Sequence, residues 1–289
     1  MNTKITLLLI LALLSVSTSP IIGRALVGVN AVSISFWRMF IAAIILWGFS
    51  IIKPQGKMKD KINANRTICA GILLGIHFAL FFEAIKMTKI ANATFLGTLA
   101  PFFTLLVELY ILKRYYNNKV LLGLFFTLIG SVVILGYQFN LDSQYTIGNL
   151  YALLCSLCIA IALMIGEKVR QKENTIVYTR SLYLSASFTL FIVSILVNQT
   201  LLNFNINEFL GLFFLGLVPT ILGHNSIYYS IKYVPPTIVA AFPLGEPIIA
   251  TIFAFFIFSE YISLNIFIGG SITGLGLILI SVYKKTKQL

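Results

Sequence analysis

The chain has 289 residues, of which 58% are hydrophobic and only 10% are charged. A soluble chain has about a quarter of its residues charged, so this composition excludes a water-soluble globule. The net charge of +12 does not indicate a nucleic-acid partner, because the basic residues lie in short segments between apolar runs and form no basic stripe.

Apolar runs of about 20 residues, each long enough to cross a hydrocarbon core of about 30 Å, recur along the whole chain. None of them shows the alternation of a β-strand. The one sizeable polar loop between them covers residues 53–66. The sequence therefore predicts an all-α polytopic membrane protein. Its ten expected transmembrane helices cover residues 5–23, 31–52, 67–86, 92–112, 119–137, 147–167, 177–198, 208–230, 236–258 and 264–283.

The distribution of Lys and Arg predicts which ends of these helices face the cytoplasm. With the N-terminus in the cytoplasm, 16 of the 21 basic residues lie in cytoplasmic segments and three lie on the opposite side. The other two, Arg38 and Arg180, lie inside expected helices. Because loops rich in Lys and Arg stay in the cytoplasm, we expect both termini there.

The two halves of the chain are similar to each other. Residues 81–103 (FFEAIKMTKIANATFLGTLAPFF) match residues 227–249 (IYYSIKYVPPTIVAAFPLGEPII) without gaps at an offset of 146 positions. The same offset relates Pro101 to Pro247. The offset is about half the length of the chain, so we expect two repeats.

Each half, residues 1–140 and 145–289, contains five of the expected helices. Because five is odd, two such halves in series must cross the membrane in opposite orientations. An inverted repeat lets one central site open alternately to each side of the membrane, which points to transport. The first apolar run also fits a cleaved signal peptide, but its removal would leave the first half one helix short.

Three segments carry a resemblance to a known family. They are residues 36–46 (FWRMFIAAIIL), residues 77–106 (HFALFFEAIKMTKIANATFLGTLAPFFTLL) and residues 223–260, which include an L-G-E-P turn. Over essentially its whole length the chain resembles the EamA-type branch of the drug/metabolite transporter superfamily. The resemblance implies a ten-helix basket in which helices 1–4 and 6–9 surround a central cavity and helices 5 and 10 lie to one side. Known relatives move amino acids, related amines and carboxylates, or nucleotide-linked metabolites.

The first repeat departs from the second at two acidic positions. Ala100 stands where the second repeat has Glu246, and Arg114 stands where it has Glu260. We therefore expect binding chemistry that is asymmetric about the axis relating the two halves.

Ionisable residues inside the expected helices are candidates for function, because each costs about 2.5–3.5 kcal/mol at a helix centre on insertion scales. The overlapping depths of Arg38 and Glu83 predict a charge-assisted pair between them. Glu246 is the strongest candidate, because Pro243 and Pro247 on either side of it loosen the helix and leave carbonyl groups free. For substrate binding or gating we select Arg38, His77, Glu83, Pro101, His224, Glu246 and Pro247.

Structural roles compete with these assignments. Arg38 could tie to a backbone carbonyl or to its acidic neighbour, and the two histidines could form hydrogen bonds between helices. Glu246 could serve helix packing. Glu108 is expected to pair with Lys113 or Arg114 and receives no site role.

Two pairs of glycines, Gly71 with Gly75 and Gly270 with Gly274, have the G-x-x-x-G spacing that lets helix backbones approach closely. Packing inside the molecule is the default interpretation. A homodimer through helix 5 or helix 10 is the alternative.

We expect a secondary transporter that moves a small polar metabolite, an amino acid or a related amine or carboxylate, by alternating access and in the direction of export. We expect no metal and no cofactor, and the expected partners are the small-molecule substrate and the lipid bilayer. The expected location is the plasma (inner) membrane of a bacterium. The alternatives are an intramembrane enzyme, which the loop positions of Asp60 and Asp142 argue against, and a membrane scaffold or sensor.

Overall fold

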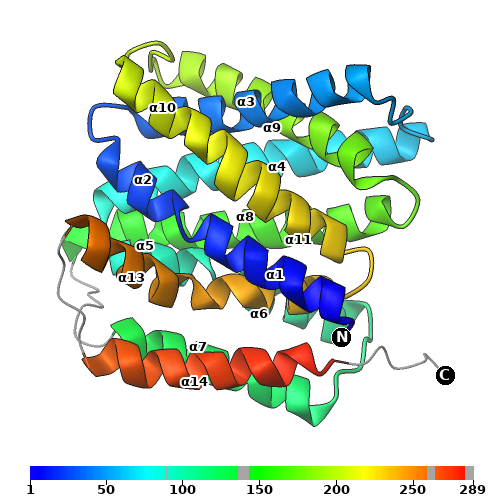
Figure 1. Cartoon of the computed structure of the whole chain (residues 1–289), viewed down its shortest axis with the longest axis vertical. Coiled ribbons are helices and arrows are strands. Elements are labelled where there is room, and N and C mark those ends of the chain that lie inside the picture. The colour runs from blue at the N-terminus through cyan, green and yellow to red at the C-terminus, as the bar shows by residue number, and fades with distance from the viewer. Residues whose placement is uncertain (89, 136–142, 259–263, 284–289) are drawn as a thin grey trace.

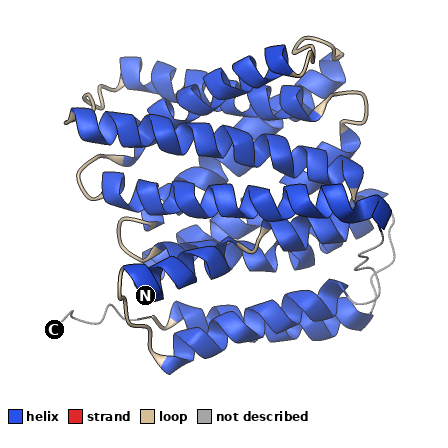
Figure 2. Ribbon diagram, turned by 180° about the vertical axis from the view of Figure 1, so that it is seen from behind, coloured by secondary structure: helices blue, strands red, loops and turns tan. Residues whose placement is uncertain are grey.

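The computed structural model describes residues 1–88, 90–135, 143–258 and 264–283, and every regular element in these ranges is helical (Figures 1 and 2). Nine helical segments in the described ranges are long and apolar enough to cross a membrane. A further apolar helix, α7 (Asn118–Leu135), runs up to residues outside the described ranges, so the expected span 119–137 is described only in part. The chain is therefore a polytopic helical membrane protein.

The helices of the first half follow the expected order. They are α1 (Thr3–Val16), α2 (Ser19–Ala25), α3 (Ala31–Ile52), α4 (Lys61–Met87), α5 (Ile90–Gly97), α6 (Ala100–Leu106), the π-helix η1 (Val107–Ile111) and α7.

The second half also combines continuous and interrupted helices, but in a different order. It contains the short 3-10 helix η3 (Ser143–Tyr145), then α8 (Thr146–Arg170), α9 (Thr175–Leu196), α10 (Ile206–Leu215), the π-helix η4 (Gly216–His224), α11 (Asn225–Ser230), α12 (Pro236–Ala241), the 3-10 helix η5 (Phe242–Gly245), α13 (Glu246–Phe258) and α14 (Leu264–Ser281).

Helix α4 begins earlier than the sequence predicts. The expected loop at residues 53–66 ends at Asp60, whose side chain caps the helix by accepting a hydrogen bond of 2.6 Å from the backbone N–H of Asn63. An aspartate at this position satisfies an orphan donor of the first turn. The polar residues that follow are therefore helical, and the start predicted at residue 67 is wrong.

Proline accompanies the interruptions of four membrane-crossing segments. Pro20 opens α2 after α1 ends, Pro101 opens α6 after α5 ends, and Pro219 lies inside η4. The fourth break, η5, contains Pro243 and is followed by Pro247. Each proline removes a backbone donor and clashes with the preceding turn, which accounts for a break in the helix at each of these places.

Helices α7 and α14 pack against each other along their length and lie to one side of the other helices (Figure 1). Glycine allows this close approach, because a Cβ added to Gly123 would lie 2.8 Å from the carbonyl oxygen of Gly276. The expected packing of Gly71 is also internal, against the backbone of α9, where an added Cβ would lie 2.7 Å from the Leu182 carbonyl oxygen. The backbone contacts in both places leave no room for a larger residue.

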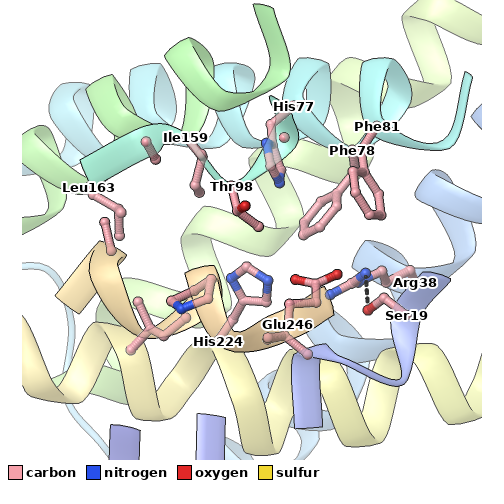
Figure 3. A pocket seen from close by; sticks show the side chains of 16 residues that line it. Ser19, Arg38, His77, Phe78, Phe81, Thr98, Ile159, Leu163, His224 and Glu246 are labelled. Atoms are coloured by element: carbon pink, nitrogen blue, oxygen red, sulfur yellow. Dashed lines mark hydrogen bonds between the residues drawn. The ribbon is translucent and has the colours of Figure 1, made fainter. Parts of the chain in front are cut away.

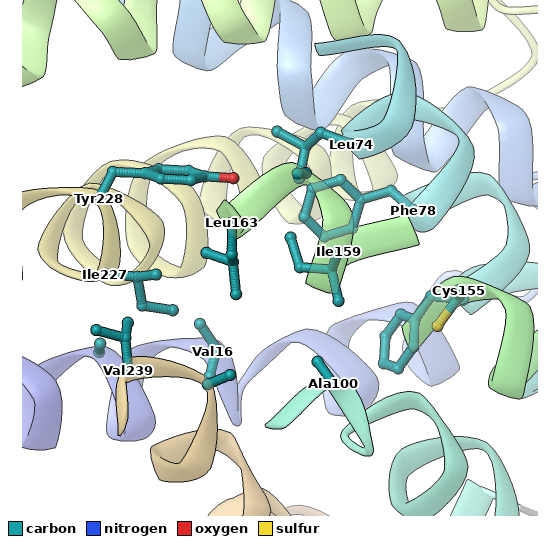
Figure 4. Packing of buried hydrophobic residues seen from close by; sticks show 14 of the residues in the cluster. Val16, Leu74, Phe78, Ala100, Cys155, Ile159, Leu163, Ile227, Tyr228 and Val239 are labelled. Atoms are coloured by element: carbon teal, nitrogen blue, oxygen red, sulfur yellow. The ribbon is translucent and has the colours of Figure 1, made fainter. Parts of the chain in front are cut away.

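The buried core lies between the remaining helices and draws on both halves of the chain. Figure 4 shows Leu74 and Phe78 from α4 near Ile159 and Leu163 from α8 and Ile227 from α11. Large apolar side chains on the outer faces stay exposed, as is typical of surfaces that contact lipid. Examples are Phe188, Ile195, Phe256 and Phe267.

Candidate functional site

A cavity lies in the middle of the molecule, and its volume is about 80 Å³ (Figure 3). This volume is smaller than that of drug-sized ligand sites, which is about 300–1,000 Å³, and it favours a small ligand. Its lining residues are Val16, Ser19, Arg38, His77, Phe78, Phe81, Gly97, Thr98, Ala100, Ile159, Leu163, His224, Ile227, Ala240, Pro243 and Glu246.

The interrupted helices supply much of this lining. Ser19 is the first residue of α2, Thr98 lies in the break between α5 and α6, and His224 ends η4. Pro243 lies in η5, and Glu246 is the first residue of α13. Broken helices place polar side chains and helix ends at the depth of a membrane-embedded site.

Arg38, on the continuous helix α3, is held in one orientation. It is 1% exposed. Its Nε donates a hydrogen bond of 2.9 Å to the Thr220 hydroxyl, and one terminal nitrogen donates a bond of 3.0 Å to the Ser19 hydroxyl. The guanidinium also lies over the Phe78 ring, 4.0 Å from its centroid. These partners are neutral, so they orient the positive charge without neutralising it.

The predicted pair between Arg38 and Glu83 is wrong. The assigned hydrogen bonds of Arg38 go to Ser19 and Thr220, and Glu83 is partly exposed and does not line the cavity. Glu83 follows Phe81 by two residues, which is about 200° around a helix of 3.6 residues per turn. The two residues therefore lie on nearly opposite faces of α4, and equal depth does not bring Glu83 to Arg38.

Glu246 is the acidic group of the cavity. It is 6% exposed, and its Oε1 has no hydrogen-bond partner among the described residues. Figure 3 shows its carboxyl group directed toward the guanidinium of Arg38. Within the described ranges, the ion pairs include neither residue. The cavity thus presents two buried groups of opposite charge that are not bonded directly to each other.

The two histidines add neutral polar groups between the charged residues and the rest of the cavity. The Nδ1 of His77 lies 2.8 Å from the carbonyl oxygen of Cys155. Because a carbonyl only accepts, Nδ1 carries the proton in the neutral ring and Nε2 is an acceptor. His77 therefore forms the expected bond between helices and also lines the cavity. The Nδ1 of His224 is buried without a hydrogen-bond partner among the described residues.

Comparison with known protein families identifies the family of this chain. The model of the EamA-like transporter family matches the chain twice, at residues 3–136 and 146–282. The chain belongs to the EamA-like transporter family. Transport across a membrane is therefore its general activity.

Relatives of this EamA-like chain carry the same broad description. An uncharacterized transporter of Archaeoglobus fulgidus is 26% identical over 96% of this chain and 98% of its own length. The uncharacterized transporter YyaM of Bacillus subtilis is 24% identical over 87% of both chains. A crystal structure of a protein aligns with 98% of each chain at 16% identity and a TM-score of 0.83. That last likeness shows the shared fold.

The structure brings together four of the seven predicted site residues of this EamA-like protein. Arg38, His77, His224 and Glu246 line the cavity. Pro101 and Pro247 stand beside the helix breaks that shape it, without lining it themselves.

Sequence reasoning missed several lining residues. Gly97 and Ala100 could have been found, because the offset of 146 aligns them with Pro243 and Glu246. The sequence does not single out Ser19, because a serine before a proline is common at any helix start.

A second cluster of polar groups joins the halves of the chain away from the cavity. Glu108 in η1 is fully buried and accepts hydrogen bonds of 2.5 Å from both Arg114 and the Tyr116 hydroxyl. The expected pairing with a neighbouring cation is thus confirmed for Arg114. Arg114 also binds Glu167 of α8, at 2.9 Å. Burial, together with the neighbouring Glu108 carboxylate, raises the pKa of Tyr116 well above its usual value, so this hydroxyl stays a donor.

Proposed function

We propose that this EamA-like protein is a secondary transporter that moves an amino acid, or a related small amine or carboxylate, out of the cell by alternating access. One observation carries the proposal. The central cavity holds Arg38 and Glu246, two buried groups of opposite charge that are not paired with each other.

A zwitterion complements these two groups. A guanidinium is suited to a planar carboxylate, which it can bind through two parallel hydrogen bonds. Ser19 and Thr220 fix the Arg38 side chain before any ligand arrives, so little ordering is needed on binding. The free Oε1 of Glu246 and the Nε2 of His77 are acceptors suited to an ammonium group. A buried charge left unpaired is costly, which favours a ligand that satisfies both.

The two-fold match of the family model supports an inverted repeat of five helices in each half, residues 1–140 and 145–289. The offset of 146 also relates the break at Thr98 to the break in η5. In this arrangement ten helices cross the plasma membrane of a bacterium, both termini lie in the cytoplasm, and the cavity lies between the halves. Rocking of one half against the other would then expose the cavity to one side at a time.

The test is counterflow in liposomes that contain the purified protein. Vesicles are loaded with one unlabelled compound and diluted into a trace of the same compound in labelled form, for a panel of amino acids, amines and carboxylates. We expect accumulation of label for amino acids, and none in vesicles without protein. A panel in which no compound accumulates above the empty vesicles would overturn the proposed function.

Arg38→Gln is the first variant to compare, with Arg66→Gln as its matched control. Arg66 is exposed and does not line the cavity. Its substitution therefore removes one arginine and leaves the cavity unchanged. We expect counterflow to fall to background in Arg38→Gln and to persist in Arg66→Gln.

A further inference from the structure

The cavity is polarised along its length. Ser19, Arg38 and Glu246 gather at one end, whereas Ile159 and Leu163 lie at the other (Figure 3). Ala240 and Glu246 both line the cavity and are six residues apart on the interrupted helix from α12 to α13. At about 1.5–2.0 Å per residue, these two lining positions are about 9–12 Å apart along the helix. The cavity is therefore longer than a zwitterionic head group.

The end away from the charges is formed by an apolar wall. Its side chains come from four helices, α1, α8, α11 and α12, and all are buried. Figure 4 shows Val16, Leu163 and Ile227 gathered in one place with Ile159 beside them. The apolar wall consists of Val16, Ile159, Leu163, Ile227 and Ala240.

Two of the polar groups near the wall are engaged elsewhere, whereas the Nδ1 of His224 has no hydrogen-bond partner among the described residues. The Thr98 hydroxyl donates to the carbonyl oxygen of Phe95, at 3.0 Å, and the Nδ1 of His77 faces Cys155. His224 lies between the charged end and the wall (Figure 3). A polar group of a ligand that lies against the apolar wall, beyond His224, would lose its hydration without gaining a hydrogen-bond partner. This loss disfavours the binding of such a ligand.

We infer that the preferred substrate is an amino acid with an aliphatic side chain of about the size of leucine, whose side chain packs on the apolar wall while its carboxylate meets Arg38. This inference rests on the proposed function and specifies its substrate. Ile159 and Leu163 then determine specificity, because they contact the side chain of the substrate and not its charged groups.

The experiment compares two substrates with the same charged groups. Counterflow is measured separately with labelled leucine and with labelled serine, and each is challenged with unlabelled norleucine, serine and asparagine at equal concentrations. We expect leucine to exchange with an apparent KM lower by about tenfold or more than that of serine, as is typical when several methylenes are lost from an apolar pocket. We also expect norleucine to compete better than asparagine.

A variant pair on the wall tests the residue assignment. Leu163→Thr introduces a hydroxyl and removes volume, and Leu163→Met keeps the wall apolar at a similar volume. We expect the preference for leucine over serine to shrink several-fold in Leu163→Thr and to persist in Leu163→Met. If Leu163→Thr does not fold, Ile227→Thr replaces it.

The outcomes separate the two claims. Exchange of both labelled amino acids with equal apparent KM would overturn the inference and leave the proposed function intact. An unchanged preference in the wall variants would overturn the assignment of the wall. Absence of exchange with every amino acid would overturn the proposed function and the inference together.

Discussion

Thr237 of α12 donates hydrogen bonds to the carboxylate of Glu108 through its backbone N–H, at 3.3 Å, and through its hydroxyl. Glu108 belongs to the first half of the chain and Thr237 to the second. The contact lies where α6 packs on α12, and the Thr237 hydroxyl also lies 2.9 Å from the hydroxyl oxygen of Thr104 on α6. This contact ties the two broken helices of the halves together at one end.

We predict that Glu108→Ala destabilises the protein. The substitution leaves Arg114 without one of its two acidic partners and leaves the donors of Tyr116 and Thr237 unsatisfied. The loss should be about 2–4 kcal/mol of unfolding free energy, measured by denaturant titration in detergent. Glu83→Gln, at a partly exposed position, should change it little. Equal stability of the two variants would contradict the account of this cluster.

Thr237→Val should show how much the contact between the halves contributes. Valine keeps the shape of threonine and removes only the hydroxyl, so we expect a loss of about 1 kcal/mol. In the double variant with Glu108→Ala, the losses should be less than additive, because both remove the same bond. Additive losses would mean that the two side chains act independently.

The fixed orientation of Arg38 predicts that its charge alone is insufficient. Arg38→Lys keeps a positive charge but loses the planar group that reaches Ser19 and Thr220 and binds a carboxylate through two bonds. We expect Arg38→Lys to retain less than about a tenth of wild-type counterflow. Ser19→Ala, which removes one of the two supports, should raise the apparent KM with a smaller loss of rate. If Arg38 is only a structural tie, Arg38→Lys would reduce stability and leave transport per folded molecule unchanged.

The packing of α7 on α14 predicts opposite results for two nearby glycines. A Cβ on Gly276 would lie 2.6 Å from the Gly123 carbonyl oxygen, whereas a Cβ on Gly274 would meet no atom within 4 Å. Gly276→Ala should therefore destabilise the protein by about 1–3 kcal/mol. Gly274→Ala should be neutral or stabilising by about 0.5–1 kcal/mol, because alanine is the better helix former. Thermal unfolding of the two purified variants checks the contrast, and a destabilised Gly274→Ala would show that this face of α14 is covered.

Much of the fold follows from the sequence because the membrane imposes simple constraints. Apolar length predicts the helices, and the offset of 146 relates Pro101 to Pro247, each of which lies beside an interruption in the structure. The fifth helix is described only up to Leu135, so the full set of ten remains a prediction. The start of α4 was misplaced because hydropathy does not register a polar first turn capped by Asp60.

The site was predicted less completely, since a linear sequence gives the depth of a residue but not the face of the helix on which it lies. Equal depth in the membrane predicts a pair of Arg38 and Glu83, but the face of α4 on which Glu83 lies excludes this pair. The bonds of Arg38 to Ser19 and Thr220 depend on two local breaks, at the start of α2 and in η4. A π-helix with Pro219 inside it has no periodic signature in the sequence.

The most direct test of the central claim is the binding of labelled leucine to the purified protein in detergent. Wild type is compared with Arg38→Gln, Glu246→Gln and the exposed control Arg66→Gln, after thermal unfolding has shown that each variant is folded. We predict that both cavity variants lose affinity by at least about tenfold and that the control binds as wild type does. Undiminished binding in folded Arg38→Gln and Glu246→Gln would contradict the claim that these two residues hold the substrate.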